Sequence, residues 1–232
     1  MNQTYEFDGG TVTMPVEVRD AAAATAMFDV DATYAATLVP PAFDVVQTAP
    51  GRTDLSIGCI DYVDNDLGDY LEVGIIFFVR PAAGPTDGSA NGTFIWKLPV
   101  DQQFTCDAGE GIWGFPKTVE RITASSSDDS WTWRLDMDGQ HVFTVTLPAG
   151  GDDDMGDMDM TTYTMRNGVP HATVFSQGGP SSAVRIGGDG VSIELGSHPI
   201  AKDLAALGLP AGATMSTYTG HMHGRFEAPE RL

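Results

Sequence analysis

The sequence predicts a mainly β protein with few helices (α+β), whose short strands form an antiparallel, barrel-like sheet. Many short segments are apolar or alternate between apolar and polar residues, and Gly, Asn, Asp and Pro separate them. Only two segments have a helical pattern. Many short strands with turn signals are typical of closed or nearly closed antiparallel sheets. No internal repeat or composition boundary divides the chain, so we expect a single domain over residues 1–232.

Two segments predict strands joined by a polar turn at 61–68, and two others predict a hairpin around Met137-Asp138-Gly139, because Asp-Gly favours a two-residue turn. The full set of expected strands is 52–62, 71–80, 93–100, 131–136, 140–147, 163–165, 172–175, 183–186 and 191–195. Two glycine-rich stretches, 178–180 and 187–190, predict further turns.

Two helices are expected. The first covers 32–38 and ends before Pro40, and the second covers 200–207 and ends at Gly208, with Pro210 beyond it.

Composition excludes several classes of function. The net charge of −20 disfavours nucleic acid and anionic membrane surfaces as partners. No apolar run approaches the ~18–20 residues that span a membrane, and residues 1–6 lack the pattern of a secretory signal. Nothing requires Cys59 and Cys106 to pair, so we expect a cytoplasmic protein.

Lys117, one of only three lysines, lies in the apolar, glycine-rich segment GIWGFPKT at 111–118. Pro116 fixes its own φ and favours an extended Phe115, so the approach to the lysine is held in place. Apolar neighbours remove water from an ammonium and lower its pKa, and a neutral amine can attack a carbonyl to form a Schiff base. Composition alone favours a simpler interpretation, in which the lysine stem passes Trp113 and the ammonium remains in water.

The strand 71–80 carries a second candidate group. With a two-residue period, Glu72, Gly74, Ile76 and Phe78 share one face, and the opposite face is also apolar. The strand is therefore predicted to be buried on both sides. Its glutamate fits either a solvated strand end or an acid in a pocket.

Two other clusters suggest metal ligands, but neither has the spacing of a metal site. The acidic segment 150–160 has oxygen ligands that suit calcium or magnesium, yet it lacks an EF-hand register, and we expect a mobile loop or an oligomer contact. His221 and His223 could chelate zinc, but no third ligand follows. We expect no metal and no cofactor. Trp131 and Trp133 are predicted to pack within a strand.

Four parts of the chain resemble the acetoacetate decarboxylase-like superfamily. The stretch LPVDQQFTCDAGEGIWGFPKTVER at 98–121 resembles that family's active-site segment. Residues 67–79 resemble the segment that bears an active-site glutamate, and Arg19 precedes Asp29 and Asp31 with the family's spacing. Residues 198–225 resemble its closing helix and strand, so the resemblance spans roughly 12–230.

The resemblance implies a β-barrel-like fold, a Schiff base on Lys117, an active-site role for Glu72, and a role for Arg19 in orienting an acidic group. We also expect Trp113, Phe115, Ile76 and Phe78 to line the substrate pocket. Relatives with this fold are commonly homo-oligomers, and the implied partner is a small oxo-acid substrate. No cofactor is needed, because an iminium on the lysine is itself an electron sink.

Two departures from the family pattern affect the choice of substrate. Acetoacetate decarboxylase proper has a second lysine where this chain has Thr118, and its second pocket glutamate falls near Ile57 or Gly58. We therefore expect Lys117 to titrate below an ordinary lysine, though less so than with two lysines, because an ionised Glu72 opposes the shift.

The expected function is a Schiff-base-forming lyase that decarboxylates a β-keto acid. The alternatives are an aldolase-dehydratase on the same scaffold and a non-catalytic binding protein.

Overall fold

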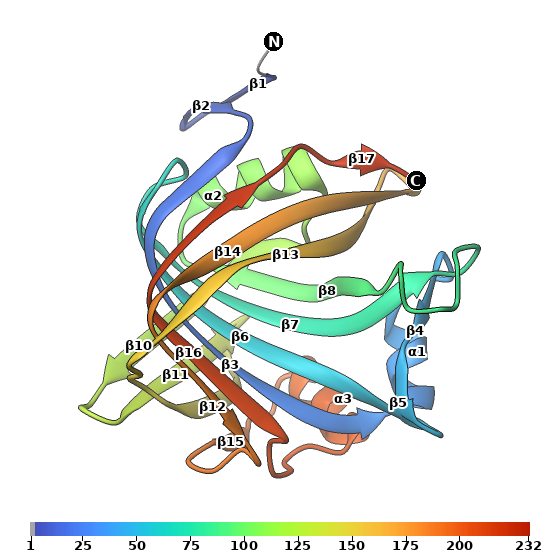
Figure 1. Ribbon diagram of the computed structural model, residues 1–232, viewed down its shortest axis with the longest axis vertical. Coiled ribbons are helices and arrows are strands. Elements are labelled where there is room, and N and C mark those ends of the chain that lie inside the picture. Colours follow the sequence, from blue (N-terminus) through green and yellow to red (C-terminus); the bar gives the residue numbers. More distant parts are fainter. Residues whose placement is uncertain (1–2) are drawn as a thin grey trace.

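The computed structural model describes residues 3–232, and seven of its strands form a closed barrel (Figure 1). Around the barrel the order is β7-β6-β3-β16-β14-β13-β8, and pairing of β8 with β7 closes it. In chain order the elements are β1 (Thr4–Phe7), β2 (Gly10–Thr13), β3 (Val16–Asp31), α1 (Ala32–Leu38), β4 (Phe43–Val45), β5 (Gln47–Ala49), β6 (Arg52–Asn65), β7 (Tyr70–Pro81), β8 (Gly92–Val100), α2 (Gln103–Ala108), the π-helix η1 (Gly109–Trp113), β9 (Lys117–Val119), β10 (Arg121–Ser126), β11 (Ser130–Met137), β12 (Gln140–Pro148), β13 (Asp153–Arg166), β14 (Val169–Ile186), β15 (Ser192–Leu195), α3 (Pro199–Leu207), β16 (Met215–Phe226) and β17 (Glu230–Arg231). The predicted mainly β, barrel-like fold is confirmed.

One seam of the barrel is parallel, whereas the other barrel pairs are antiparallel. β8 runs parallel to β13, and β9 adds to the same strand, also in parallel, with Leu98 opposite Lys117. Parallel neighbours require a long crossover connection. Here the crossover contains α2, η1, β9 and the hairpin strands β10 to β12.

A second sheet, with the order β10-β11-β12-β15, contributes to the larger hydrophobic core together with α1 and α3. Its side chains, such as Trp133 and Phe143, share that core with Val73, Ile75 and Phe77 of the barrel wall. These β7 residues are the face opposite Glu72, so the strand is buried on both sides as its sequence predicts.

The β11–β12 hairpin has the expected turn. Asp138 and Gly139 both have positive φ, 50° and 72°, which is the backbone of a type I′ turn. Trp131 and Trp133 are buried on β11 and pack edge to face with 4.7 Å between ring centroids. They are packing residues, as predicted.

Both expected helices form. Asp31 accepts a hydrogen bond from the Tyr34 amide and caps α1, and Gly208 ends α3 with φ of 116°. The pair α2 and η1, between β8 and β9, was not expected.

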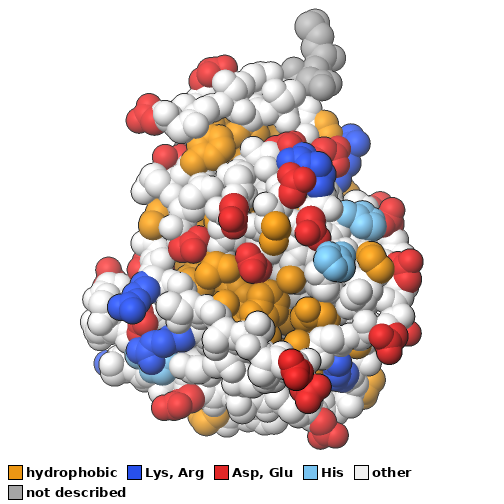
Figure 2. Space-filling model, turned by 90° about the vertical axis from the view of Figure 1, so that its left-hand side faces the viewer, with side chains coloured by type: hydrophobic (Ala, Val, Ile, Leu, Met, Phe, Trp, Pro, Cys, Tyr) orange, Lys and Arg blue, Asp and Glu red, His pale blue; other side chains and the backbone are white. Residues whose placement is uncertain are grey.

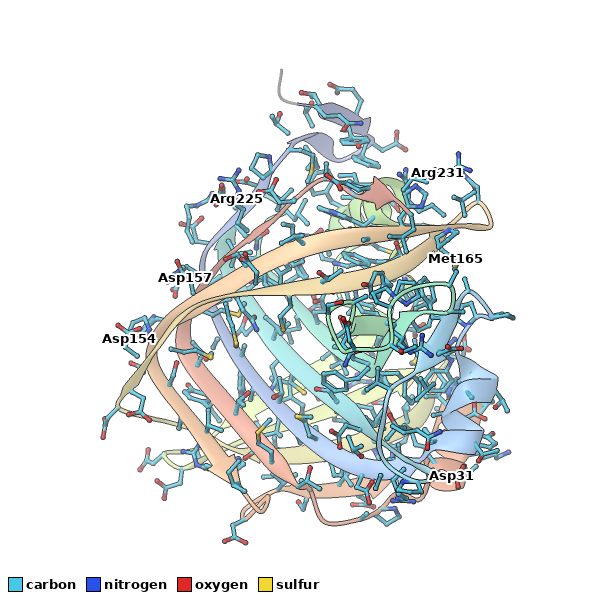
Figure 3. All side chains as sticks on the ribbon, turned by 45° about the vertical axis from the view of Figure 1, so that its right-hand side comes forward. Asp31, Asp154, Asp157, Met165, Arg225 and Arg231 are labelled. Carbon is cyan, nitrogen blue, oxygen red and sulfur yellow. The ribbon has the colours of Figure 1, made fainter. Side chains whose placement is uncertain are left out.

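Two sequence predictions fail in the wall formed by β13 and β14. The acidic segment expected as a mobile loop lies largely in β13, and the predicted turn at 178–180 lies inside the continuous strand β14. The pairing of β13 with β14 shifts register between Asp153 and Met158, and their partners on β14 are Ser182 and Gln177. Bulges of this kind absorb extra residues without ending a strand, so glycine and proline are tolerated there. Figure 3 shows Asp154 and Asp157 on the outer side of the barrel wall.

The surface carries the acidic excess of the composition. On the face drawn in Figure 2, acidic side chains are spread around a hydrophobic patch. Cys59 and Cys106 are free thiols in different hydrophobic clusters. None of the helices within residues 3–232 combines the length and hydropathy that crossing a bilayer would need.

Candidate active site

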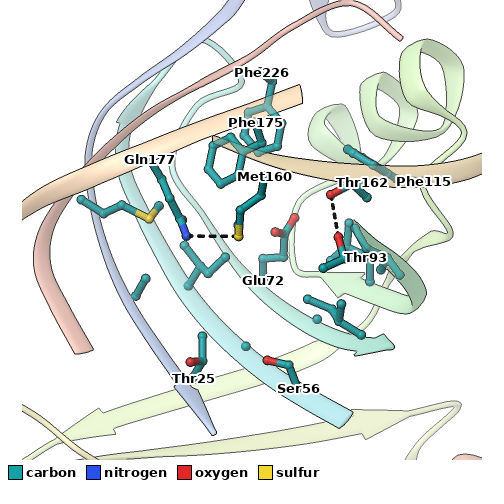
Figure 4. Close-up of a pocket in the computed structure, with 18 of the residues that line it drawn as sticks. Thr25, Ser56, Glu72, Thr93, Phe115, Met160, Thr162, Phe175, Gln177 and Phe226 are labelled. Atoms are coloured by element: carbon teal, nitrogen blue, oxygen red, sulfur yellow. Dashed lines mark hydrogen bonds between the residues drawn. The ribbon is translucent and has the colours of Figure 1, made fainter. Parts of the chain in front are cut away.

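The barrel encloses a cavity of about 280 Å³. Its wall consists mainly of inward-facing side chains of the seven barrel strands, and residues of η1 and β9 line one end (Figure 4). Most of the lining is apolar, and a few hydroxyl groups and one ion pair lie within it. A largely apolar pocket with few convergent polar groups is the usual form of a small-molecule site.

Lys117 enters this cavity from β9. The π-helix η1 ends at Gly114, which has φ of 73°, and Pro116 then leads the chain into the short parallel pairing with β8. Successive residues of a strand point to opposite sides, so Lys117 is buried whereas Thr118 is exposed. The position of the family's second lysine therefore faces away from the cavity in this chain.

The Lys117 ammonium forms a buried ion pair. Its Nζ lies 2.8 Å from Glu72 Oε2 and donates a hydrogen bond of 2.9 Å to Thr105 Oγ1 on α2. The two charged side chains are only 4% and 7% exposed. Nζ also lies 4.8 Å from the centroid of the Tyr70 ring, within the range of a cation–π contact.

Glu72 also contacts Tyr62, one of two stacked tyrosines of the barrel. Glu72 faces the lumen on β7, in register with Ile60 of β6. The Tyr62 hydroxyl lies 3.4 Å from Glu72 Oε1, and the Tyr62 and Tyr70 rings stack with centroids 4.5 Å apart. The two stacked tyrosine rings therefore pack against the ion pair.

The pKa of Lys117 is raised above its ordinary value, which corrects the expectation of a lowered one. Burial acts to lower this pKa, but the adjacent Glu72 and Tyr70 together outweigh burial. The sequence predicts that Glu72 only reduces the lowering of this pKa, but at 2.8 Å from the amine the carboxylate acts more strongly than that prediction allowed. Burial also raises the pKa of Tyr70 to about 12 and that of Tyr62 well above 10, so both phenols are neutral at pH 7.

Aromatic residues cover the same end of the cavity. Trp113 stacks on Phe115 with centroids 5.5 Å apart, and Phe226 stacks on Phe175 at 4.0 Å. The Trp113 indole donates to the Glu227 carbonyl at 2.9 Å, which fixes the ring of η1 against the end of β16. This cover keeps bulk water from the Lys117 amine.

The sequence model of the acetoacetate decarboxylase (ADC) family matches residues 6–172. The chain belongs to this family. No curated protein sequence matches it.

Solved structures of related enzymes share the fold. Acetoacetate decarboxylase from Legionella pneumophila subsp. pneumophila str. Philadelphia 1 is 15% identical with a TM-score of 0.66, over 94% of this chain and 87% of that chain. An acetoacetate decarboxylase-like enzyme from Sphingomonas wittichii RW1 is 17% identical with a TM-score of 0.61, over 95% and 94%. The enduracididine biosynthesis enzyme MppR, solved in complex with pyruvate, is 12% identical with a TM-score of 0.62, over 100% and 98%.

In this acetoacetate decarboxylase family member, six of the seven residues singled out from the sequence lie at the cavity. Lys117 and Glu72 are in contact, and the other four line the same space: Trp113, Phe115, Ile76 and Phe78.

Arg19 does not line the cavity. Its guanidinium donates to Asp64 at 2.7 Å and to Asp66 at 2.6 Å on the surface, with 48% of its side chain exposed. The pairing of β3 with β6 shifts register between Val18 and Ala21, so alternation counted along β3 is interrupted here. Of the two aspartates that followed Arg19 in the resemblance, Asp29 pairs with Arg52 and Asp31 caps α1.

Other residues of the site were missed. Tyr70 belongs to the same alternation as Glu72, so extending that strand by one residue could have found it. Thr105 lies on the unexpected helix α2, and no sequence signal indicated that it faces Lys117. Met155, Met158 and Met160 line the cavity from the segment that was interpreted as a loop.

The suggested metal clusters have other partners. His221 lies 3.1 Å from Asp20, and His223 lies 2.8 Å from Asp157. Within residues 3–232, no three His, Cys, Asp or Glu side chains are grouped so that they could hold a metal ion.

Proposed function

We propose that Lys117 forms a Schiff base with a small oxo acid and that the protein is a cofactor-independent lyase, which decarboxylates a β-keto acid. The observation that carries this proposal is the buried Lys117–Glu72 pair, 2.8 Å apart in an apolar cavity. Membership of the acetoacetate decarboxylase family supports it.

The raised pKa of Lys117 means that the amine must lose a proton before it can attack. Glu72 is the acceptor in contact with it, and transfer of one proton leaves an amine and a carboxylic acid, both neutral in an apolar site. The Nζ lone pair then forms a bond to the carbonyl carbon. Protons returned through Glu72 allow the carbonyl oxygen to leave as water, and an iminium remains.

The iminium nitrogen then serves as the electron sink. When the carbon–carboxylate bond breaks, CO2 leaves and its bonding electrons form an enamine. A proton adds to the enamine carbon, and water hydrolyses the resulting iminium to give the ketone and the free Lys117 amine. The cover formed by Trp113 and Phe115 would protect these intermediates from untimely water.

A related chemistry uses the same intermediate differently. An enamine can attack an aldehyde carbon, after which loss of water gives an unsaturated product. The neighbour MppR was solved with the condensation product of pyruvate and imidazole 4-carboxaldehyde, which supports this aldolase-dehydratase alternative. Release of CO2 from a β-keto acid favours the lyase, and an aldehyde-dependent product without CO2 favours the alternative.

A non-catalytic binding protein is a second candidate, and one observation favours it. The pKa of Lys117 is raised, so the resting amine is a charged ammonium with both a carboxylate and a hydroxyl as partners. Such a group binds anions or carbonyl oxygens but does not attack carbon.

Borohydride trapping separates these candidates. The protein is incubated with a panel of 2-oxo and 3-oxo acids, reduced, and analysed by peptide mass spectrometry. We expect one adduct on Lys117, whose mass corresponds to loss of one water and gain of two hydrogens. Lys117→Ala and Lys117→Arg should abolish it, whereas Lys97→Ala and Lys202→Ala should not. Binding of the acids without an adduct would support the binding protein instead.

A further inference from the structure

The charges of the cavity restrict what it can bind. Among the described residues that line it, Lys117 and Glu72 are the only charged side chains. They are paired with each other, so no second cation is free to hold the carboxylate of a small, strongly polar acid. The rest of the lining is apolar or hydroxyl-bearing, and this composition suits a hydrophobic chain.

Two glycines line the lumen next to the ion pair, and one of them leaves it open. Gly58 of β6 and Gly74 of β7 are register partners, and the next inward-facing pair is Ile60 and Glu72. A Cβ added to Gly58 would meet only Thr25 Cγ2, at 3.8 Å, and would otherwise point into empty space. At Gly74 a Cβ would meet Ile76 Cδ1 at 3.1 Å and Leu98 Cδ1 at 3.6 Å, so the open space lies on the Gly58 side of this pair.

The cavity continues beyond this glycine pair. The next inward-facing register pair is Ser56 and Ile76, and Ile76 lies four residues from Glu72 along β7. At about 3.4 Å per residue, that separation is roughly 14 Å. At the level of the glycines, the Thr25 and Thr217 hydroxyls are 2.7 Å apart, and Figure 4 shows Thr25 and Ser56 at the end away from Phe226.

The wall of the cavity formed by β13 can change its shape to fit a ligand. Met155, Met158 and Met160 of β13 line the cavity, and Gln177 holds the Met160 sulfur at 4.0 Å. Methionine side chains are unbranched and polarisable, so they fit chains of different shape with little strain. A wall of methionines suits an alkyl chain better than a four-carbon acid.

We propose that the substrate is an oxo acid with an unbranched alkyl chain, whose carbonyl lies at Lys117 and whose chain runs along the lumen past Gly58 towards Ser56. This inference rests on the proposed Schiff-base function. It assigns Gly58 as the residue that sets the permitted chain length.

The test uses straight-chain 2-oxo acids from pyruvate to a chain of about ten carbons, a length that matches the lumen. These acids stand in for 3-oxo acids, because they form the same iminium on Lys117 but cannot lose CO2 to give an enamine. The concentration dependence of borohydride trapping gives an apparent affinity for each acid. Gly58→Val places a branched side chain in the lumen without straining the strand, because Gly58 has no positive φ. Gly212→Val is the matched control, since Gly212 is exposed and has open space around its Cβ position.

In the wild type we expect affinity to increase about fourfold with each added methylene until the lumen is full. Gly58→Val should weaken trapping of the longest acids at least tenfold and leave pyruvate trapping unchanged, and Gly212→Val should resemble the wild type. Equal affinities along the series, or an equal effect of Gly58→Val on all acids, would overturn the inference while the Schiff base stands.

If no acid gives an adduct, the proposed function fails instead. Calorimetric binding of the same series then tests whether the cavity holds an alkyl chain. Affinities that do not change with chain length would overturn this inference as well.

Discussion

Gly109, the first residue of η1, lies directly against the aliphatic stem of Lys117. A Cβ at position 109 would lie 2.6 Å from Lys117 Cδ and 2.8 Å from Cε. Such distances are not tolerated, so the Gly109→Ala side chain must displace the lysine. We expect the rate of borohydride trapping to fall about a hundredfold, because small misplacements of a reacting group are costly. Gly212→Ala, at an open surface position, should trap at the wild-type rate, and equal rates for both variants would contradict the packing argument.

Glu72→Gln should lower the pKa of Lys117. Burial acts to lower this pKa, and the Glu72 carboxylate is the first of the causes that raise it. Without that charge the burial effect should dominate. Acylation of Lys117, followed by mass spectrometry against pH, should be half-maximal above 10.5 in the wild type and at lower pH in the variant. Lys97 and Lys202 serve as internal controls in the same spectra, and an unchanged Lys117 profile would show that Glu72 does not set this pKa.

Removing one partner of the ion pair should destabilise the protein, whereas replacing both partners with apolar residues should cost little stability. Lys117→Ala leaves Glu72 buried without a partner, which should reduce the free energy of unfolding by about 3–5 kcal/mol at pH 7. The double variant Lys117→Met, Glu72→Leu should recover most of that loss, because apolar pairs of similar volume often match a buried ion pair. Urea denaturation of both variants measures the difference. A double variant as unstable as Lys117→Ala would contradict this account.

Alkaline stability provides a separate measurement on the same pair. The folded pKa of Lys117 is raised above its unfolded value, so the stabilisation it provides is fully present below about pH 10.4 and is lost as the pH rises through the folded pKa. We expect the wild type to lose more of its free energy of unfolding above that pH than the double variant does. Parallel pH curves for the two proteins would show that Lys117 makes no such contribution.

Arg19→Ala should leave trapping at Lys117 unchanged. The guanidinium lies on the surface between Asp64 and Asp66 and does not reach the cavity, although the family resemblance suggested a role there. The expected result is an unchanged concentration dependence for pyruvate, with Arg52→Ala as a matched surface control. A weaker apparent affinity in Arg19→Ala alone would show that Arg19 contributes to substrate binding.

We predict a homo-oligomer, and two exposed residues near the end of β14 are the first place to look for its interface. Val184 and Ile186 are 57% and 78% exposed, and as alternate residues of one strand they lie on the same face of it. Sedimentation at physiological salt should give a species heavier than 24.6 kDa, and Ile186→Lys should shift it towards that mass. Low salt should weaken association, because each chain carries a charge of −20. A single 24.6 kDa species in all conditions would rule the prediction out.

Local sequence patterns predicted those elements in which a single pattern, such as strand alternation or a turn dipeptide, determines the whole element. The alternation from Glu72 to Phe78 gave both faces of β7, and the Asp138-Gly139 pair gave the hairpin turn. The end of α1 followed from the prolines that come shortly after it.

The failures occur where tertiary structure overrides local preference. The glycines and proline at 178–180 indicate a turn when they are considered alone, but β14 stays paired with β16 in one register and forms a bulge only against β13. The pKa of Lys117 depends on a contact between residues 45 positions apart, and Arg19 depends on a register shift. No local pattern encodes either of these.

The Asp and Met residues of β13 assign two properties, the surface charge and the lining of the cavity, to different side chains of one strand. Aspartates 153, 154, 157 and 159 are exposed to solvent, whereas Met155, Met158 and Met160 line the cavity, although Met158 is also 48% exposed. Substitutions at the three methionines can therefore be combined in a mutant library without altering the net charge of the protein. Because the acidic exterior keeps such variants in solution, selection on this segment can act on substrate range almost alone.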